Sequence, residues 1–291
     1  MAFDLKDCRY CGEGRFDLGD YPTSARIDKS ERERYEELTS QNMRRVQALQ
    51  NKLYAEGREG VVILLQAMDA AGKDSTIKRV MSEVNPQGVE VHTFKQPSTE
   101  ELGHDYLWRA VRCLPVRGKI ALFNRSYYED VLVVRVHRMQ HGYRMPDRCV
   151  DMDDDEFFER RLKRISEFEE HLWENGYRVM KVFLNVSPEE QKQRFLERID
   201  NPSKNWKFSE ADITERAFWP KYQKAYQDAI DRTATHHSPW YVIPADQKWF
   251  ARWLVSEAIV DLLEDIDPHY PELPKDQREK LGEYRERLEG M

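Results

Sequence analysis

Five short apolar runs recur along the chain, separated by stretches with the spacing of amphipathic helices. The first, Val61–Leu65, is a continuous run of β-branched residues and leucine, which predicts a strand buried on both faces and therefore central in a parallel sheet. The others are Val89–Phe94, Lys119–Asn124, Val179–Val186 and Trp240–Ile243. Because strands and helices alternate, we predict an α/β fold with a doubly wound, five-stranded parallel sheet between two helical layers.

Three further stretches of the sequence have features of helices or of a lid. Residues 29–56 carry apolar side chains near a helical period, which predicts an amphipathic helix lying on the core. Residues 156–174 repeat the pattern with a basic, solvated side. Residues 187–210 are rich in cations and contain the turn-forming segment Asp200–Ser203, so we expect an active-site lid in this insertion after a strand.

The charge balance excludes some partners. Lys and Arg number 46 and Asp and Glu number 53, so the net charge of −7 argues against a surface built to hold nucleic acid. The longest apolar run is too short to span a bilayer, and the charges between Asp4 and Arg9 interrupt any secretory signal, which favours a cytoplasmic location and no membrane partner. A polyanion site must therefore be a local basic patch.

The cysteines give no clear metal motif. Cys8 and Cys11 share a C-x-x-C spacing, whereas Cys113 and Cys149 stand alone without a nearby histidine at ligand spacing. Reduced thiols in a cytosolic chain are the favoured interpretation, and a zinc site completed by a distant partner is the alternative.

A phosphate-binding loop follows the first strand. Residues 67–76, read Ala-Met-Asp-Ala-Ala-Gly-Lys-Asp-Ser-Thr, have the strand, loop and helix order of a Walker A motif, in which successive N–H groups and a lysine face a phosphate. The residues that would face the phosphate are Ala70, Ala71, Gly72, Lys73, Asp74 and Ser75.

Two positions depart from the usual Walker A pattern. Ala67 replaces its first glycine and Asp74 replaces the Ser or Thr that usually helps to hold Mg²⁺, so we expect the metal to be positioned differently. Asp69 becomes a candidate for water-mediated metal binding or for deprotonating an acceptor. A Gly-Lys pair that only caps a helix is the alternative interpretation of the motif, and the buried strand before it makes that alternative the weaker one.

A second cluster follows the third strand, at the edge where open α/β sheets bind ligands. Ser126 is expected to cap a short helix with Glu129 and Asp130 in its first turn. Arg125 would then reach into a crevice facing the phosphate-binding loop, where a guanidinium can bind two phosphate oxygens. Taken alone, this arginine would be explained better by a surface ion pair with Glu129, but two such clusters at adjacent strand ends make the ion pair the weaker interpretation.

Further cations are expected around the same crevice. Lys95 lies at the end of the second strand, where its ammonium can bind an acceptor phosphate. The lid stretch supplies Arg194, Arg198, Lys204 and Lys207. The alternative for these lid residues is an ordinary solvated helix face.

Together these motifs closely resemble the polyphosphate kinase 2 family, whose fold is similar to that of thymidylate kinase. The matching segments are residues 66–74, 94–98, 123–132, 205–208 and 239–246, which spread over most of residues 30–265. The resemblance implies a P-loop kinase that transfers a terminal phosphoryl group between inorganic polyphosphate and a purine nucleotide. It also implies a divalent cofactor, Mg²⁺ or alternatively Mn²⁺.

The resemblance assigns roles to individual residues. Asp69 and Lys73 act in the Walker A loop, and Arg125 belongs to the Walker B region. Asp69 and Glu129 are the metal-binding candidates. The polyphosphate candidates are the loop residues 70–75 with Arg194, Arg198, Lys204 and Lys207, and the nucleotide-binding candidates are Lys95, Asn124, Arg125, Glu129 and Asp130.

Asn124 points to one subgroup of the family. Many relatives carry Asp at this position, and Asn combined with Glu129-Asp130 is similar to the subgroup that uses both AMP and ADP. We therefore predict reversible transfer to both acceptors, forming ADP and ATP, with GMP and GDP as further acceptors. A homo-oligomer, dimer or tetramer, is also expected.

The predicted organisation has three parts. Residues 1–56 form an N-terminal extension and the amphipathic helix, residues 57–266 the P-loop kinase domain with its lid at about 187–210, and residues 267–291 a charged, peripheral or partly disordered tail.

The residues by themselves do not name the phosphate donor, so two other functions stay open. One is an ATP-dependent nucleoside monophosphate kinase on the same frame. The other is a nucleotide-gated switch in an interaction protein. Guanine-specific switches carry the motif Asn-Lys-x-Asp. Here Asn51-Lys52 is followed by Leu53-Tyr54 and lies upstream of the loop, which disfavours a guanine-specific switch.

Overall fold

A six-stranded sheet forms the centre of the molecule in the computed structural model, which describes residues 3–291. The strand order is β1-β6-β5-β2-β4-β3. The strands are β1 (Arg9–Tyr10), β2 (Gly60–Ala67), β3 (Val89–Thr93), β4 (Ile120–Asn124), β5 (Tyr177–Asn185) and β6 (Trp240–Pro244). The strands β2 to β6 are parallel, as predicted.

The prediction of five strands was wrong in number. The additional strand, β1, pairs antiparallel with β6 through Arg9 and Tyr10 at one edge of the sheet. Two residues are too few to show a hydrophobic period, so no pattern in the sequence could reveal this strand.

The central position predicted for the first apolar run is confirmed. All residues of β2 are buried, and the strand lies between β4 and β5. Burial on both faces leaves no solvated side for polar residues, which explains the unbroken run Val61–Leu65.

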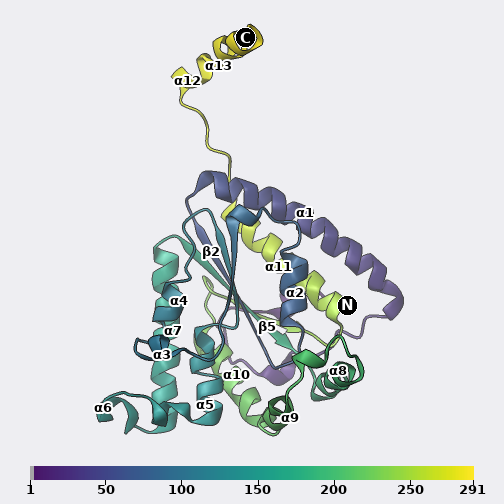
Figure 1. Cartoon of the computed structure of the whole chain (residues 1–291), viewed down its shortest axis with the longest axis vertical. Helices are drawn as coiled ribbons and strands as arrows, with labels where there is room; N and C mark the ends of the chain where they lie inside the picture. Colours follow the sequence, from purple (N-terminus) through teal and green to yellow (C-terminus); the bar gives the residue numbers. More distant parts are fainter. Residues whose placement is uncertain (1–2) are drawn as a thin grey trace.

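Helices cover both faces of this sheet, which gives the three layers (Figure 1). On one side lie α1 (Arg32–Glu56), α2 (Lys73–Val80) and α11 (Lys248–Ile266). On the other lie α4 (Trp108–Val111), α7 (Asp154–Glu174) and α10 (Trp219–Thr233). The remaining short helices of this region are α3 (Thr99–Leu102), α5 (Val133–His137) and α6 (Asp147–Val150).

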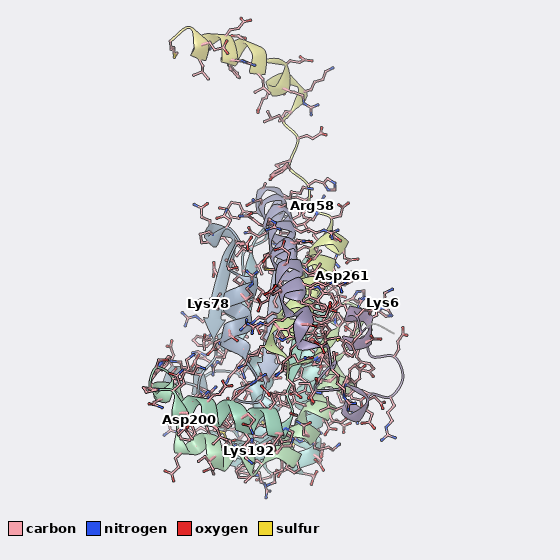
Figure 2. The ribbon with its side chains drawn as sticks, turned by 90° about the vertical axis from the view of Figure 1, so that its right-hand side faces the viewer. Lys6, Arg58, Lys78, Lys192, Asp200 and Asp261 are labelled. Carbon is pink, nitrogen blue, oxygen red and sulfur yellow. The ribbon has the colours of Figure 1, made fainter. Side chains whose placement is uncertain are left out.

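The cation-rich stretch after β5 forms helices near the carboxyl ends of the strands. They are α8 (Pro188–Asp200), a 3-10 turn over Asn205–Lys207 and α9 (Glu210–Arg216). Figure 2 shows Lys192 and Asp200 on α8 at the end of the molecule opposite the C-terminal arm. The stretch therefore lies beside the edge of the sheet where the phosphate-binding loop begins.

The C-terminal residues form an arm that points away from the body (Figure 1). It contains α12 (Lys275–Glu279) and α13 (Leu281–Glu289), and neither helix has a buried residue. Over residues 3–291, no helix is both long and apolar enough to cross a membrane.

The four cysteines are free thiols. Cys8 is buried, and burial raises the pKa of its thiol. No cluster of three or more metal-binding side chains occurs in the described part of the chain, so Cys8 and Cys11 acquire no partner that completes a zinc site there.

Candidate active site

The phosphate-binding loop joins β2 to α2. Gly72 precedes the helix with a φ of 109°, a conformation open to glycine, and Ala70 adopts a φ of 61°. A left-handed residue other than glycine costs about 1–3 kcal/mol and is typical of functional sites. The loop thus aims its backbone and the first turn of α2 at the space beside the strand ends.

Lys73 begins α2 and is almost fully buried. Its ammonium donates a hydrogen bond to the Ala67 carbonyl, 2.8 Å away. Burial lowers the pKa of Lys73, whereas the nearby Asp69 opposes that change. Because Lys73 is almost fully buried, water screens its charge only weakly, and a phosphate bound beside it gains correspondingly more.

Arg194 lies under the loop rather than in open solvent. Its guanidinium donates to the carbonyls of Ala70 (3.0 Å) and Ala71 (2.7 Å) and to those of Ala245 (2.7 Å) and Asp246 (3.0 Å). Its Nε donates to Glu190 over 2.7 Å. These bonds use every guanidinium nitrogen, so Arg194 holds the loop to the end of β6 and is not free to follow a polyphosphate chain.

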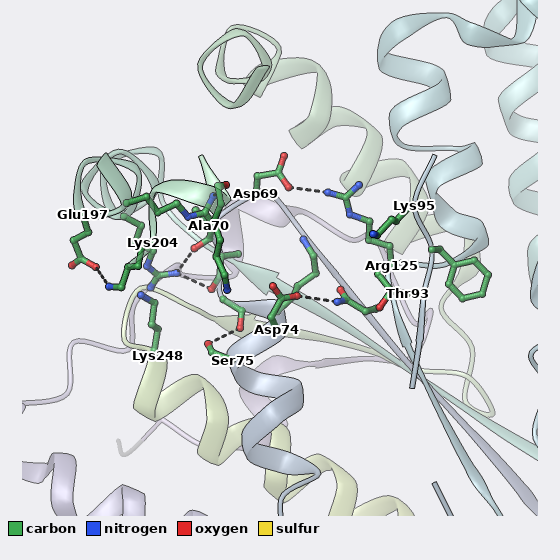
Figure 3. Close-up of a pocket in the computed structure, with 18 of the residues that line it drawn as sticks. Asp69, Ala70, Asp74, Ser75, Thr93, Lys95, Arg125, Glu197, Lys204 and Lys248 are labelled. Carbon is green, nitrogen blue, oxygen red and sulfur yellow. Dashed lines mark hydrogen bonds and ion pairs between the residues drawn. The ribbon is translucent and has the colours of Figure 1, made fainter. Parts of the chain in front are cut away.

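Arg125 faces the loop from the end of β4, as predicted. Its φ is 63°, and its N–H donates to the Leu65 carbonyl over 3.0 Å. The guanidinium lies 3.0 Å from Asp69 and 3.8 Å from Glu129, so it contacts both predicted metal-binding carboxylates. Figure 3 shows the pair of Arg125 with Asp69 at the rim of the cleft.

Asn124 precedes Arg125 and contacts the Walker A loop directly. Its amide donates to Asp74 over 2.9 Å, across the gap between β4 and α2. The two positions that differ from the usual patterns are therefore partners, and the neutral amide satisfies a carboxylate that a second carboxylate would repel.

Glu129 and Asp130 point to different places. Ser126 caps their 3-10 turn, as predicted, by accepting a hydrogen bond from the Tyr128 N–H. Glu129 lies against Arg125, and burial raises the pKa of its carboxyl. Asp130 is instead paired with Arg161 of α7 at 2.8 Å.

The structure does not bring Asp130 to the cleft, contrary to its selection as a nucleotide-binding residue. Successive residues of a 3-10 turn project about a third of a turn apart, so neighbours cannot share a direction.

The main cleft, defined by residues 69–75, 93–96, 124–125 and side chains of α8 and α11, has a volume of about 570 Å³. Lys95 lines it from the end of β3, and Arg198, Lys204 and Lys207 line it from the lid stretch. Of the predicted site residues, the cleft therefore gathers all except Glu129 and Asp130.

A smaller inner cavity of about 180 Å³ lies on the other side of Asp69 and Arg125. It is lined by Ala67, Met68, Asp69, Arg125, Glu129, Val133, His137, Gln191, Asp212, Glu215, Tyr222 and Tyr226. Glu215 lies 3.0 Å from His137 and accepts a hydrogen bond from Tyr222 at 2.8 Å. Asp69 and Arg125 thus form the boundary shared by both spaces.

Several of these residues escape prediction from sequence. Lys248 and Arg252 line the main cleft from α11, and the position of Lys248 just after β6 is the signal that could have revealed it. Gln191 donates to the Asp69 carbonyl over 2.9 Å. His137, Glu215 and Tyr222 come from separate elements, and only folding brings them together.

A buried carboxylate in the core holds the segment that carries Arg125 and Glu129. Glu169 of α7 accepts hydrogen bonds from Tyr127 (2.8 Å), Tyr128 (2.9 Å) and Ser238 (2.8 Å). The ammonium of the fully buried Lys181 also contacts Glu169 and donates to the Thr233 carbonyl over 2.6 Å. Both charges are therefore compensated within the core.

The donor atoms of the site suit a hard divalent cation. Asp69 offers a carboxylate that is 38% exposed at the cleft, and Glu129 offers a second beyond Arg125. Mg²⁺ typically uses one or two protein carboxylates together with water and substrate phosphates. The site therefore fits a cation that arrives with phosphates, and it needs no larger protein cluster.

Comparison with known proteins places these observations in a family. A sequence model described as Polyphosphate kinase 2 (PPK2) matches residues 29–271. An ADP-polyphosphate phosphotransferase of Rhodopseudomonas palustris is 45% identical over 95% of this chain and 96% of its own length.

Two further matches extend over nearly the full chain. An AMP/ADP-polyphosphate phosphotransferase of Meiothermus ruber is 42% identical over 95% of this chain and 99% of its own. The crystal structure of polyphosphate kinase 2 from Arthrobacter aurescens superposes with a TM-score of 0.87 at 35% identity, covering 100% of this chain and 99% of that one.

Proposed function

Because the chain belongs to the polyphosphate kinase 2 family, we propose that it transfers the terminal phosphoryl group of inorganic polyphosphate to AMP and to ADP, forming ADP and ATP reversibly. One observation carries the proposal. Asp69 and Arg125 lie in one cation-lined cleft, where the phosphate-binding loop faces the ends of β3 and β4, so donor and acceptor can approach the same point from two sides.

In this proposal the donor binds at the side of the main cleft formed by the loop, and the acceptor binds at the side formed by the ends of β3 and β4. The N–H groups of residues 70–75 and the Lys73 ammonium bind the terminal phosphates, and Lys73 balances the charge on the group in transfer. An oxygen of the acceptor phosphate attacks the terminal phosphorus, and the bridging oxygen leaves with the shortened polyphosphate.

The acceptor side is built from Arg125, Lys95 and Asn124. Arg125 binds the acceptor phosphate and keeps its attacking oxygen in line with the donor phosphorus, and Lys95 adds charge at the mouth of the cleft. Asp69 either holds the metal or accepts the proton of the acceptor. Members of the family use a divalent metal, and we propose Mg²⁺, held by Asp69 and Glu129, with Mn²⁺ as a substitute; when bound, it neutralises phosphate charge.

Use of both acceptors requires a nucleoside that shifts by one phosphate unit. The related proteins differ in name on this point, since one is called an ADP and the other an AMP/ADP phosphotransferase. We propose that this chain uses AMP as well, because neutral Asn124 repels neither acceptor and Glu129 can hold a metal-bound water where AMP lacks a phosphate.

The decisive experiment supplies AMP, ADP, GMP or GDP with either ATP or long-chain polyphosphate and identifies the products. We expect ADP and ATP from AMP with polyphosphate. Turnover with ATP alone would establish the monophosphate kinase instead, and no turnover with either donor would favour the switch.

Dual acceptor use has its own test in Glu129→Ala, with the exposed Glu189→Ala on α8 as control. We expect kcat/KM to fall more for AMP than for ADP in the first variant and to change for neither acceptor in the second. Equal losses would remove the special role of Glu129, and a wild type inert toward one acceptor would refute dual use.

The assembly and location of the chain are also proposals. Exposed apolar side chains on the arm, Leu281, Tyr284 and Leu288, support a homo-oligomer, dimer or tetramer. Nucleotide substrates support a cytoplasmic location. Light scattering on the full chain measures the oligomeric state, and a monomer would refute the proposed homo-oligomer.

A further inference from the structure

Three cations of the lid stretch already contact neighbouring side chains. Arg198 lies 3.6 Å from Asp212, and Lys204 lies 3.7 Å from Glu197. The Lys207 ammonium lies over the ring of Trp206, 5.0 Å from its centre. A phosphate chain that followed the lid would have to compete with these contacts.

Two cations of the same cleft lack such direct contacts. Lys248 and Arg252 stand one turn apart on α11, both partly buried, and within residues 3–291 neither side chain has a hydrogen-bond or ion-pair partner. The Arg252 Nε is buried with its hydrogen-bonding capacity unused. Unpaired cations at such depth are costly unless an anion joins them.

The surroundings of Lys248 also favour the binding of an anion. An added side-chain carbon at Gly72 would lie 3.9 Å from the Lys248 stem and 4.0 Å from Arg194, so Lys248 packs directly against the phosphate-binding loop. Figure 3 shows it rising from α11 toward the loop. Burial and the charge of Arg194 lower the pKa of Lys248, and the charges of Glu197 and Glu190 oppose part of that change without forming an ion pair with it.

We propose that Lys248 and Arg252 bind the phosphates of the donor that follow the transferred one, so that polyphosphate leaves the loop along α11 rather than along the lid. This inference rests on the proposed function and adds the path of the donor. Gly72 and Lys248 place the first of these phosphates beside the loop, and Arg252 extends the path by one helical turn, about 5.4 Å.

The path has a limit beyond Arg252. A side cavity of about 410 Å³ shares this residue and contains Arg79, but α1 lines it with Glu33, Glu36 and Glu37. The three carboxylates outnumber Arg79 and Arg252 in this cavity, so it attracts a polyanion less than the main cleft does, and the remaining phosphates extend outward to solvent. Only the first few phosphates past the loop are therefore bound, so affinity should rise with chain length and then stay constant.

The test measures polyphosphate binding and turnover in Lys248→Gln and Arg252→Gln, which keep side-chain bulk and remove charge. The control is Lys163→Gln, an exposed lysine on α7 at the opposite face of the sheet. Dissociation constants for fluorescently labelled long polyphosphate are measured at several salt concentrations, and KM is measured for tripolyphosphate and long polyphosphate.

We expect each α11 variant to weaken long-chain binding by about three- to tenfold, with the slope of log affinity against log salt falling by about 0.7 per lost charge. The KM for ADP should stay within about a factor of two, and Arg252→Gln should spare tripolyphosphate more than Lys248→Gln does. Melting temperatures equal to wild type show that both variants are folded, and the charge-retaining Lys248→Arg and Arg252→Lys should restore binding.

The outcomes separate the two levels of the proposal. If the wild type neither binds polyphosphate nor uses it as a donor, the proposed function itself is overturned. A wild type active with polyphosphate, with α11 variants that match Lys163→Gln, overturns only the α11 path. A loss confined to Lys204→Gln and Lys207→Gln likewise overturns it and assigns the donor to the lid.

Discussion

Replacement of Arg194 tests whether this side chain supports the loop or binds substrate. In Arg194→Ala, the carbonyls of Ala70, Ala71, Ala245 and Asp246 lose their donor, as does Glu190. A hydrogen bond to a charged group contributes about 1.5–3 kcal/mol, but water from the cleft can replace part of each. We therefore expect a loss of about 3–5 kcal/mol in the free energy of unfolding, equivalent to about two such bonds lost without replacement.

The conservative variant Arg194→Lys separates the effect of the positive charge from the effect of the hydrogen bonds. Lysine keeps the positive charge but cannot donate to four carbonyls in a fixed plane, so it should lose nearly as much stability as alanine. At about 2–4 °C per kcal/mol, both variants should melt about 10 °C below wild type, and kcat should fall because the loop is no longer held.

Thermal unfolding followed by circular dichroism and steady-state kinetics on the same samples measure these effects. If Arg194 bound polyphosphate, Arg194→Lys would keep the wild-type melting temperature and Arg194→Ala would raise only the KM for the donor. That pattern would refute the supporting role and restore the expectation from the sequence.

Other residues give further predictions. Lys73→Ala should lower kcat about a hundred- to a thousandfold without unfolding the protein, and a loss below about tenfold would contradict its role at the transferred phosphate. Tyr127→Phe should lower kcat several-fold, whereas Ser238→Ala, which removes one bond to the same Glu169 carboxylate, should lower only the melting temperature; equal kinetic effects would contradict a positioning role for Tyr127. Chelation of divalent ions should abolish turnover and leave the melting temperature unchanged, so activity that survives chelation would exclude a divalent metal from the reaction.

The sheet and the loop could be predicted because local pattern determines them. Val61–Leu65 and the loop after it show their strand, turn and helix in consecutive residues, and the structure places them as expected. Arg125 was found for the same reason, since the carboxyl ends of neighbouring parallel strands meet at one edge.

The errors have a common physical cause. Composition identifies Arg194 as basic, but its hydrogen bonds depend on Ala245 and Asp246, which lie about fifty residues away. Asp130 adjoins Glu129 in sequence, yet Arg161 on a distant helix determines where its carboxylate points. Lys248 and Arg252 were missed because their environment arises from the packing of α11 against the loop.

The Glu169 carboxylate has a consequence for the order in which this molecule unfolds. It joins the Arg125–Glu129 turn, through Tyr127 and Tyr128, to β5 through Lys181 and to the segment before β6 through Ser238. The turn cannot separate from the core without leaving a charged pair deficient in donors, so its local opening should be nearly as costly as global unfolding. Amide protons of the catalytic turn should then exchange with solvent as slowly as those of the central strands, unlike the mobile loops that commonly form kinase sites.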